Sequence, residues 1–228
     1  APGWSQIPEV GLALAAKAAK INGVYSAMTL LDLDTAKAKK YTDTKSVKEE
    51  SGYTSPFCYP LWPCDRVGEY ILAKSAVAGA MASDNEDVPN QSPSNHLLGV
   101  GGQCLEDGTE VYLDQDQANT VNGYGVTTAI NQNGYRLWGN YTGAYPASSD
   151  AKDIWFAVRR MFSWQGNNFI QTYFDEVDDP MNNVLVQSVV DSENIRCSAY
   201  APKYWAGASI EYKSDDNPKT AILAGTMK

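Results

Sequence analysis

Residues 126–141 constrain the fold more than any other part of the sequence. Two runs with strand character, 126–130 and 135–141, flank the segment Asn131-Gln132-Asn133-Gly134. An Asn-Gly pair supports the positive backbone φ angles of a tight turn between antiparallel strands. The sequence therefore predicts a β-hairpin here, which is its clearest local structure.

Helical and strand patterns alternate along the rest of the chain. Such alternation predicts a mixed α/β fold, with a mixed sheet flanked by helices. The stretch 83–116 is expected to be irregular and is longer than an ordinary connector, so it should be functional, mobile or interface-forming. We expect it to form a contact surface. We expect a first α/β part over 1–92 and a second over 93–228. The expected helices are 7–21, 35–50, 70–82, 117–123, 153–175 and 181–200. Further strands are expected at 24–33 and from Ile210, and 56–63 is expected to be a short strand or a turn.

Composition excludes several classes of protein. The chain has 228 residues, 43% of them hydrophobic and 20% charged, which is enough for a buried core. It contains no apolar run of membrane-spanning length and no signal-peptide pattern, so we expect a soluble, unexported protein without membrane insertion. Its formal net charge of −9 would repel a phosphate backbone, which argues against nucleic acid as a partner.

The four cysteines, Cys58, Cys64, Cys104 and Cys197, are few for a chain of this length. A chain with a sufficient core needs no covalent staples, so we expect reduced thiols. Cys58 and Cys64 have neither the Cys-x-x-Cys spacing nor a usual zinc spacing. A disulfide between these two residues remains an open alternative.

The inventory of catalytic side chains is poor. His96 is the single histidine, which excludes every metal site that needs two histidines. A triad of His96 with Ser92 or Ser94 lacks the Gly-x-Ser-x-Gly elbow that exposes a nucleophilic serine. The sequence therefore predicts no catalytic residue, no metal ligand and no cofactor, and the protein is not expected to be an enzyme.

Aromatic residues are abundant, with six tryptophans and 14 tyrosines. Exposed in a row, they would suit a secreted carbohydrate-binding module, which is the alternative function. Trp138, however, falls on a strand pattern, and Trp155 and Trp164 fall on a helical one. Packing in a core or an interface is the ordinary use of aromatic residues at such positions.

Several segments resemble contractile tail sheath proteins of myovirus-type phages, prophages and tailocins. Gly134-Tyr135-Arg136-Leu137-Trp138-Gly139-Asn140-Tyr141-Thr142 resembles the family signature Gly-x-Arg-x-Trp-Gly-x-Arg-Thr, with Tyr141 where arginine is usual. Ser92-Pro93-Ser94-Asn95 resembles a segment upstream of that signature, and Val158-Arg159-Arg160-Met161-Phe162 resembles the start of the helix after it. With Ala1-Pro2-Gly3-Trp4-Ser5 at one end and Asn217-Pro218 at the other, which also resemble family segments, the match follows the family order over nearly the whole chain.

The resemblance implies a structural subunit that assembles with copies of itself around a tail tube. Triggered by the baseplate, the sheath would contract and drive the tube through the host envelope. Such a protein is assembled in the bacterial cytoplasm and resides in the virion tail sheath. Family members carry N-terminal and C-terminal arms that add strands to neighbouring subunits. The chain is therefore expected to be a truncated sheath core, monomeric without its arms.

Charged residues near the predicted helices, which we expect to be exposed, are candidates for contacts between subunits. The acidic residues among them lack the spacing of a calcium loop, and acids before a helix favour its dipole. A single exposed ion pair contributes only about 0–1 kcal/mol, but a lattice repeats each pair many times. The candidate contacts are Arg159, Arg160, Asp175, Asp178 and Asp179.

Overall fold

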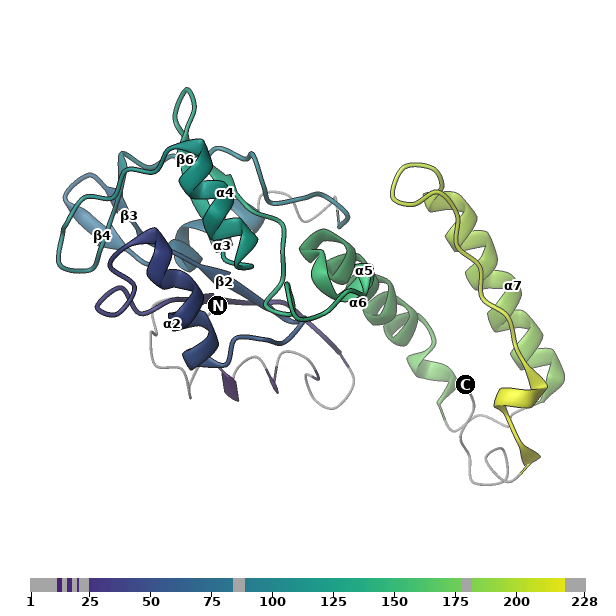
Figure 1. Ribbon diagram of the computed structural model, residues 1–228. Coiled ribbons are helices and arrows are strands. Elements are labelled where there is room, and N and C mark those ends of the chain that lie inside the picture. Colours follow the sequence, from purple (N-terminus) through teal and green to yellow (C-terminus); the bar gives the residue numbers. More distant parts are fainter. Residues whose placement is uncertain are drawn as a thin grey trace. The chain divides into compact units, whose positions relative to one another are not determined.

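The computed structural model describes residues 12–13, 16–17, 20, 25–83, 89–177 and 182–219. It separates into two compact units, Ala1–Asn167 and Asn168–Lys228, coloured purple to green and green to yellow (Figure 1). The division expected after residue 92 falls inside the first unit, where strands from both sides of that position pair. Most of the helix expected at 7–21 lies outside the described residues.

A mixed sheet forms the centre of the first unit. Strand β1 (Thr29–Asp32) pairs in parallel with β2 (Cys58–Leu61), within the segments expected to be strands. The chain after β2 continues the sheet, because Trp62 N donates to Thr127 O at 2.9 Å and Thr127 N donates to Pro60 O at 2.8 Å. An isolated parallel bridge between Leu61 and Thr127 thus joins the parallel β1-β2 pair to the chain just before β6. The combination of strands and helices fits the mixed α/β fold that the alternating sequence pattern predicts.

The predicted hairpin is confirmed. Strand β6 (Thr128–Asn131) pairs antiparallel with β7 (Tyr135–Trp138). The turn places Asn133 at φ 54° and Gly134 at φ 103°, which are angles that asparagine and glycine adopt most readily. The second strand ends at Trp138, three residues before its predicted end.

A second sheet has the order β4-β3-β5 and is antiparallel throughout. It consists of β3 (Cys64–Val67), β4 (Tyr70–Leu72) and β5 (Gly102–Cys104). Two expectations are wrong here. Residues 70–72, expected to begin a helix, form a strand because Gly68 at φ 61° lets the chain reverse onto β3. The stretch expected to be irregular contains β5, whose pairing with β3 depends on tertiary contacts.

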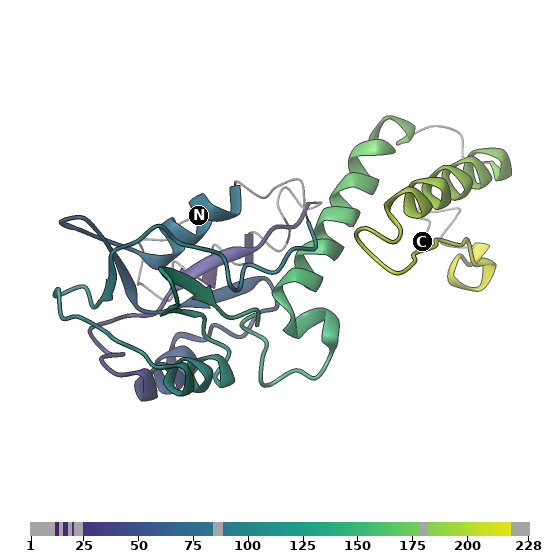
Figure 2. The ribbon, with the colours of Figure 1, turned by 90° about the horizontal axis from the view of Figure 1, so that it is seen from above.

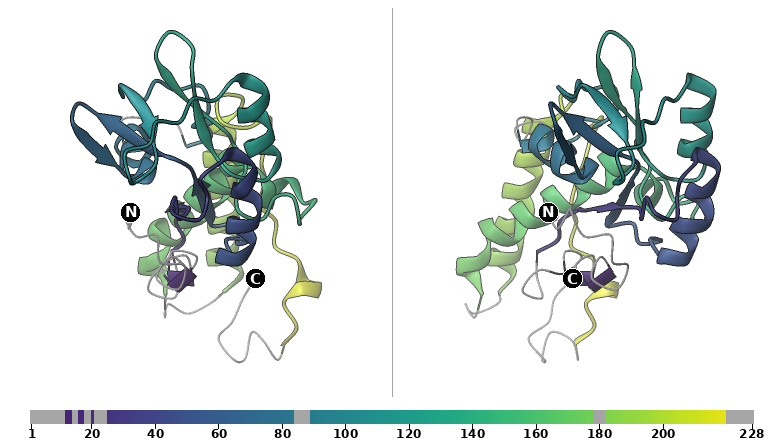
Figure 3. Two further views of the ribbon diagram at one scale, coloured as in Figure 1. Left: turned by 60° about the vertical axis from the view of Figure 1, so that its left-hand side comes forward. Right: turned by 90° about the vertical axis from the view of Figure 1, so that its left-hand side faces the viewer.

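Three helices cover the two sides of the sheet. Helices α2 (Thr44–Ser51) and α4 (Gln115–Gly123) lie side by side against one face, and α3 (Lys74–Ser83) lies on the other (Figures 2 and 3). Helix α4 begins with a capping box, in which Asp114 accepts from Gln117 N at 2.7 Å. The helix expected at 35–50 begins late, because residues 35–37 form a turn and residues 38–40 are not helical before the 3₁₀ turn at Tyr41–Asp43.

Side chains of β2 alternate between two buried clusters. Cys58 and Trp62, the residue directly after β2, belong to one cluster, whereas Tyr59 and Leu61 belong to the other. Successive strand residues point to opposite faces, so a strand covered on both faces is apolar throughout. Trp62 Nε1 donates to Ala38 O at 2.8 Å, which satisfies the polar atom of this buried ring.

Lys48 of α2 joins three segments that are distant in the sequence. Its side chain is buried, and its ammonium donates to Tyr124 O at 3.0 Å and to Tyr145 O. Burial lowers the pKa of Lys48 to about 8. The two carbonyl oxygens take the place of a carboxylate partner and fix the loops that follow α4 and precede α5 (Ala151–Ile154).

A buried polar cluster lies where α3 begins. Lys74 Nζ forms an ion pair with Asp65 of β3, and both side chains are fully buried. Asp32, at the end of β1, accepts hydrogen bonds from Ser75 N at 3.0 Å and from Ser75 Oγ. These contacts attach the start of the helix to both sheets. Burial raises the pKa of Asp32 to about 7, and it also raises the pKa of Asp65, with Lys74 opposing the rise.

The raised pKa of Asp32 predicts a pH-dependent stability. Because the folded state holds the Asp32 proton up to about pH 7 and the unfolded chain loses it near pH 3.8, the folded state binds more protons in between. This carboxyl therefore makes the free energy of unfolding fall as pH rises from 3.8 to 7, by up to about 4 kcal/mol. Urea titrations across this range should show that difference between the wild type and Asp32→Asn.

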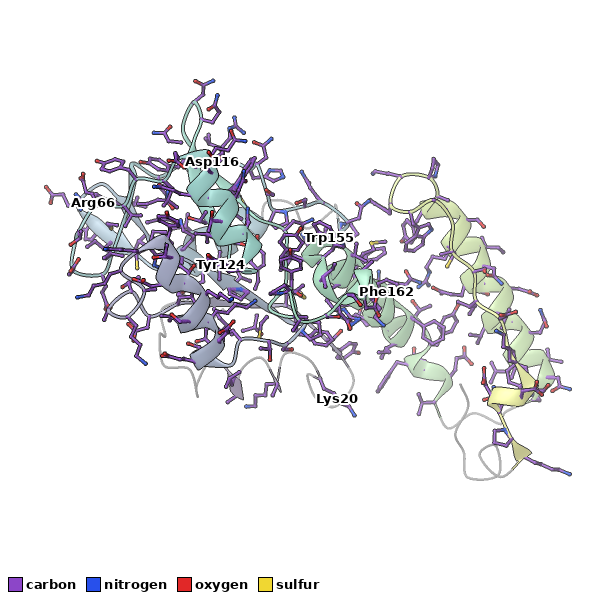
Figure 4. The ribbon with its side chains drawn as sticks, in the orientation of Figure 1. Lys20, Arg66, Asp116, Tyr124, Trp155 and Phe162 are labelled. Atoms are coloured by element: carbon purple, nitrogen blue, oxygen red, sulfur yellow. The ribbon has the colours of Figure 1, made fainter. Side chains whose placement is uncertain are left out.

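The matched control for Asp32 is Asp116→Asn, since Asp116 is an exposed carboxylate in α4 (labelled in Figure 4). This variant should follow the wild-type pH profile. If Asp32→Asn and the wild type kept a constant difference in stability between pH 3.8 and 7, the assignment of a retained proton to Asp32 would be wrong.

In the second unit, helix α7 (Asn183–Tyr200) is capped by Asn182, whose Oδ1 accepts from Val184 N and Leu185 N at 2.9 Å. The strand expected from Ile210 is absent from the described residues 182–219. Instead, the Asn194 side chain accepts from Ile210 N at 2.9 Å and donates to Ile210 O at 3.1 Å. These two bonds satisfy the backbone groups that a neighbouring strand would otherwise pair.

The helix expected at 153–175 is divided into three elements. They are α5, α6 (Phe156–Thr172) and a 3₁₀ turn at Phe174–Glu176. The break between α5 and α6 occurs at Trp155, which has extended backbone angles.

No described helix has both the length and the apolar character to cross a bilayer. The four cysteines are free and buried in this structure.

Candidate functional site

Two segments that resemble the sheath family, residues 92–95 and the signature at residues 134–142, lie side by side. Residues of the upstream segment run antiparallel to β7, where Asn95 N donates to Leu137 O at 2.6 Å and Leu137 N donates to His96 O at 2.9 Å. The pairing continues at Leu98 N, which donates to Tyr135 O at 2.9 Å. Residues 95–98 thus pair with β7 through an isolated bridge at Leu97, and residues 92–94 lead into this pairing.

Side chains of both segments reinforce this pairing. Arg136 Nη1 donates to Asn95 O at 2.9 Å, and Arg136 Nε donates to Gln132 O at 3.2 Å. Gly139 N donates to Ser94 Oγ at 3.1 Å. The guanidinium therefore connects the hairpin turn to the neighbouring segment, and its hydrogen bonds lie within the chain.

The later residues of the signature attach the hairpin to helices. Trp138 Nε1 donates to Asn119 Oδ1 of α4 at 2.9 Å. Thr142 is fully buried, and its Oγ1 donates to Asp153 O while its backbone N donates to Ile154 O at 2.9 Å. The signature residues thus connect β7 to residues 94–98, α4 and α5 by hydrogen bonds within the chain.

The buried hydroxyl of Thr142 provides a test of this role. Thr142→Val keeps the shape of the side chain but leaves Asp153 O without its donor, so it should lower the free energy of unfolding by about 1–2 kcal/mol. Urea denaturation followed by tryptophan fluorescence measures the change. Thr172→Val is the matched control, because the Thr172 hydroxyl bonds to Asn168 O on an exposed helix face. Equal effects of the two variants would contradict the role of Thr142 in attaching the hairpin to α5.

Tyr141 occupies the position where the family signature has arginine. Its ring stacks on Tyr145, with centroids 3.9 Å apart, and on Trp155, with centroids 4.6 Å apart. Trp155, labelled in Figure 4, comes from the junction of α5 and α6. Three stacked rings therefore hold the chain at this point by aromatic packing.

Ser92 and Pro93 line a small cavity of about 30 Å³, together with His96 and Arg160. Such a volume holds about one water molecule. The residues considered for a triad have other partners, since His96 Nε2 lies 2.9 Å from Gln91 Nε2, and Ser92 Oγ accepts from Ser94 N at 3.2 Å. The structure does not bring the histidine and the serines together as a hydrogen-bonded triad.

The candidate contact residues differ in their surroundings. Arg159 Nη2 lies 3.2 Å from Asp153 Oδ1, and the guanidinium lies 4.9 Å from the centre of the Phe57 ring. Its side chain is only 13% exposed, so its expected exposure is wrong. Arg160 is half-buried, and burial lowers its pKa. Asp175 is exposed, whereas Asp178 and Asp179 lie outside the described residues.

Comparisons with known proteins give sequence relatives for the chain, although no protein-family model matches it. The major tail sheath protein of Serratia phage KSP20 is 30% identical over 148 residues, which are 62% of this chain and 35% of that protein. The tail sheath protein of Escherichia phage P2 is 24% identical over 200 residues, which are 80% of this chain and 49% of that protein. The chain is therefore similar in sequence to tail sheath proteins of phages.

A solved structure shows the same fold. The helical sheath of the anti-feeding prophage in its contracted state matches with a TM-score of 0.67, covering 94% of this chain and 59% of that chain at 20% identity. The chain spans between about a third and a half of the length of the curated tail sheath relatives named above. The resemblance inferred from the sheath signature is confirmed.

Proposed function

We propose that this chain is the core of a structural subunit in a contractile tail sheath. Copies of it would surround a tail tube and, when a baseplate triggers them, contract and drive the tube through a host envelope. One observation carries this proposal: tail sheath relatives in sequence and a contracted sheath in structure match overlapping parts of the chain. Its site of action would be the virion tail, after assembly in the bacterial cytoplasm.

The hydrogen bonds that the signature residues make within the chain suit a subunit of this kind. Contraction of a sheath exchanges one packing of subunits for another, and the free energy comes from the difference between the packings. A subunit that moves as a rigid body must keep its own fold during the exchange. The bonds of Arg136, Trp138 and Thr142 within the first unit provide such rigidity.

Electron microscopy tests the proposal directly. We would image, by negative stain, the protein as its gene encodes it beside the 228-residue chain. Tubes of stacked rings from the encoded protein are the expected result, and purified tail tubes should promote them. Discrete particles in every buffer, with or without tubes of the tail tube protein, would overturn the sheath assignment.

Charged residues on the surface are the proposed contacts between subunits. Among the described candidates, Asp175 is exposed on a 3₁₀ turn, whereas Arg159 already has a partner within the chain. Reversal of a repeated surface charge adds a small penalty to every contact in the lattice. Asp175→Lys should therefore raise the protein concentration needed for tubes, as measured by sedimentation.

The matched control for Asp175 is Glu50→Lys, which reverses an exposed charge on α2. Sedimentation of both variants should show the larger effect at Asp175. An Asp175→Lys variant that assembled and contracted at wild-type concentrations would remove this residue from the proposed contacts, without affecting the sheath assignment itself.

A further inference from the structure

Two of the four free thiols face one another across the second sheet. Cys64 is the first residue of β3 and Cys104 the last residue of β5, and they are direct partners in the antiparallel register. Both are buried, with exposures of 4% and 0%. Side chains of direct partners lie on the same face of a sheet, so the two thiols are neighbours.

The register provides distances close to those of a disulfide. Directly opposed residues in an antiparallel pair have Cα atoms roughly 4.5–5.5 Å apart, inside the roughly 4.4–6.8 Å that disulfides span. Their Cβ atoms, roughly 4.5–5.5 Å apart, would approach by about 1 Å to reach disulfide geometry. Cys58, by contrast, is paired with Thr29 in the other sheet.

We propose that Cys64 and Cys104 form a reversible disulfide when the protein meets a small-molecule disulfide as oxidant. The Cys64 thiolate attacks one sulfur of the oxidant, forming a mixed disulfide and releasing one small thiolate. The Cys104 thiolate then attacks the Cys64 sulfur and releases the second small thiolate. The two cysteines lose two protons and two electrons, and the oxidant gains them as two thiols.

The buried surroundings explain why the pair is reduced at rest. Burial raises the pKa of Cys64 to about 12, and nearby Asp32, Cys104 and Asp65 oppose its ionisation, whereas Lys74 favours it. Since the thiolate is the reactive form, exchange is slow in the closed sheet and proceeds when β5 opens. The bond would then join β3 to β5 and close a loop that carries α3 and the segment 92–95.

Mass spectrometry can test this pairing in a variant that keeps only the two proposed cysteines. Trypsin leaves Cys58 and Cys64 together in the peptide 49–66 and places Cys104 in the peptide 75–136. The variant Cys58→Ser/Cys197→Ser therefore retains only the proposed pair. After incubation of the folded variant with oxidised glutathione, we expect an intact mass lower by two hydrogen atoms and a linkage between these two peptides.

Comparison with the unfolded chain shows whether the folded sheet, rather than a chance encounter, brings the two thiols together. The folded sheet raises the local concentration of each thiol near the other, so the ratio of linked product to glutathione adduct should be at least about tenfold higher than in concentrated guanidinium chloride. The linked protein should also melt about 5 °C or more above its reduced form. Adding Cys104→Ser to the variant should leave only a glutathione adduct.

Two results would overturn the proposal. One is a folded protein, kept in mild urea to permit local opening, whose Cys64 and Cys104 remain free or carry glutathione without a link. The other is a link from Cys58 to Cys64 in the wild type, detected after cleavage following Leu61 by a chymotrypsin-like protease. The wild-type digest also provides the measurement if the double serine variant fails to fold.

Discussion

Lys74→Ala is expected to lower the free energy of unfolding by about 3–5 kcal/mol. The substitution removes the ammonium that faces Asp65, and both side chains are fully buried. Asp65 would then keep a carboxylate in a dry site with no opposite charge, or hold a proton there at a cost in free energy. Its Oδ2 already has no hydrogen-bond partner.

Two variants show that the effect of Lys74→Ala comes from the orphaned charge. Lys37→Ala removes a lysine whose Nζ lies 4.0 Å from Glu50 with both side chains more than half exposed, so its effect should be below about 1 kcal/mol. The double variant Asp65→Leu/Lys74→Leu removes both charges and should be more stable than Lys74→Ala. Urea titrations at neutral pH measure all three. A double variant less stable than Lys74→Ala would contradict this explanation.

Gly139→Ala is expected to lower the free energy of unfolding by about 2–4 kcal/mol. Gly139 has φ 149°, an angle that residues with a side chain rarely adopt. An added Cβ would lie 2.5 Å from both Asn122 Oδ1 and Thr127 Oγ1, and 3.1 Å from Thr127 Cα. The hairpin would have to shift, weakening the hydrogen bond from Gly139 N to Ser94.

The matched control is Gly79→Ala, because Gly79 lies within α3 and an added Cβ would meet nothing within 4 Å. Alanine favours a helix interior over glycine by about 0.8–1 kcal/mol, so this variant should be at least as stable as the wild type. Thermal and urea unfolding of both variants make the comparison. If Gly139→Ala were as stable as Gly79→Ala, the close approach at Gly139 would not constrain the hairpin.

The sequence predicts those parts of the fold that depend on neighbouring residues. The hairpin turn follows from Asn133 and Gly134, and the buried character of β2 follows from its apolar run. Strand β5 could not be predicted, because its place is set by pairing with β3, a tertiary contact. For the same reason the strand expected at Ile210 is wrong, since a distant asparagine side chain satisfies its backbone.

For the candidate site, the family resemblance identifies the residues but not their contacts. Ser94, Arg136 and Thr142 bond to backbone groups of the same chain, and no spacing in the sequence indicates those partners. The ion pair of Arg159 with Asp153 was also hidden, because charge alone does not indicate exposure. Nor does the pattern predict that Tyr141 would stack between two rings.

The position of Lys48 has a consequence for the order in which the first unit folds. Its ammonium meets Tyr124 O and Tyr145 O, which follow it by 76 and 97 residues. Contacts of such sequence separation form late, because a long loop must close first. A chain in which α2 has formed but either loop is still open cannot bury this charge without losing a partner. Lys48 therefore makes partly assembled forms unfavourable, so the two loops and the helix become ordered together.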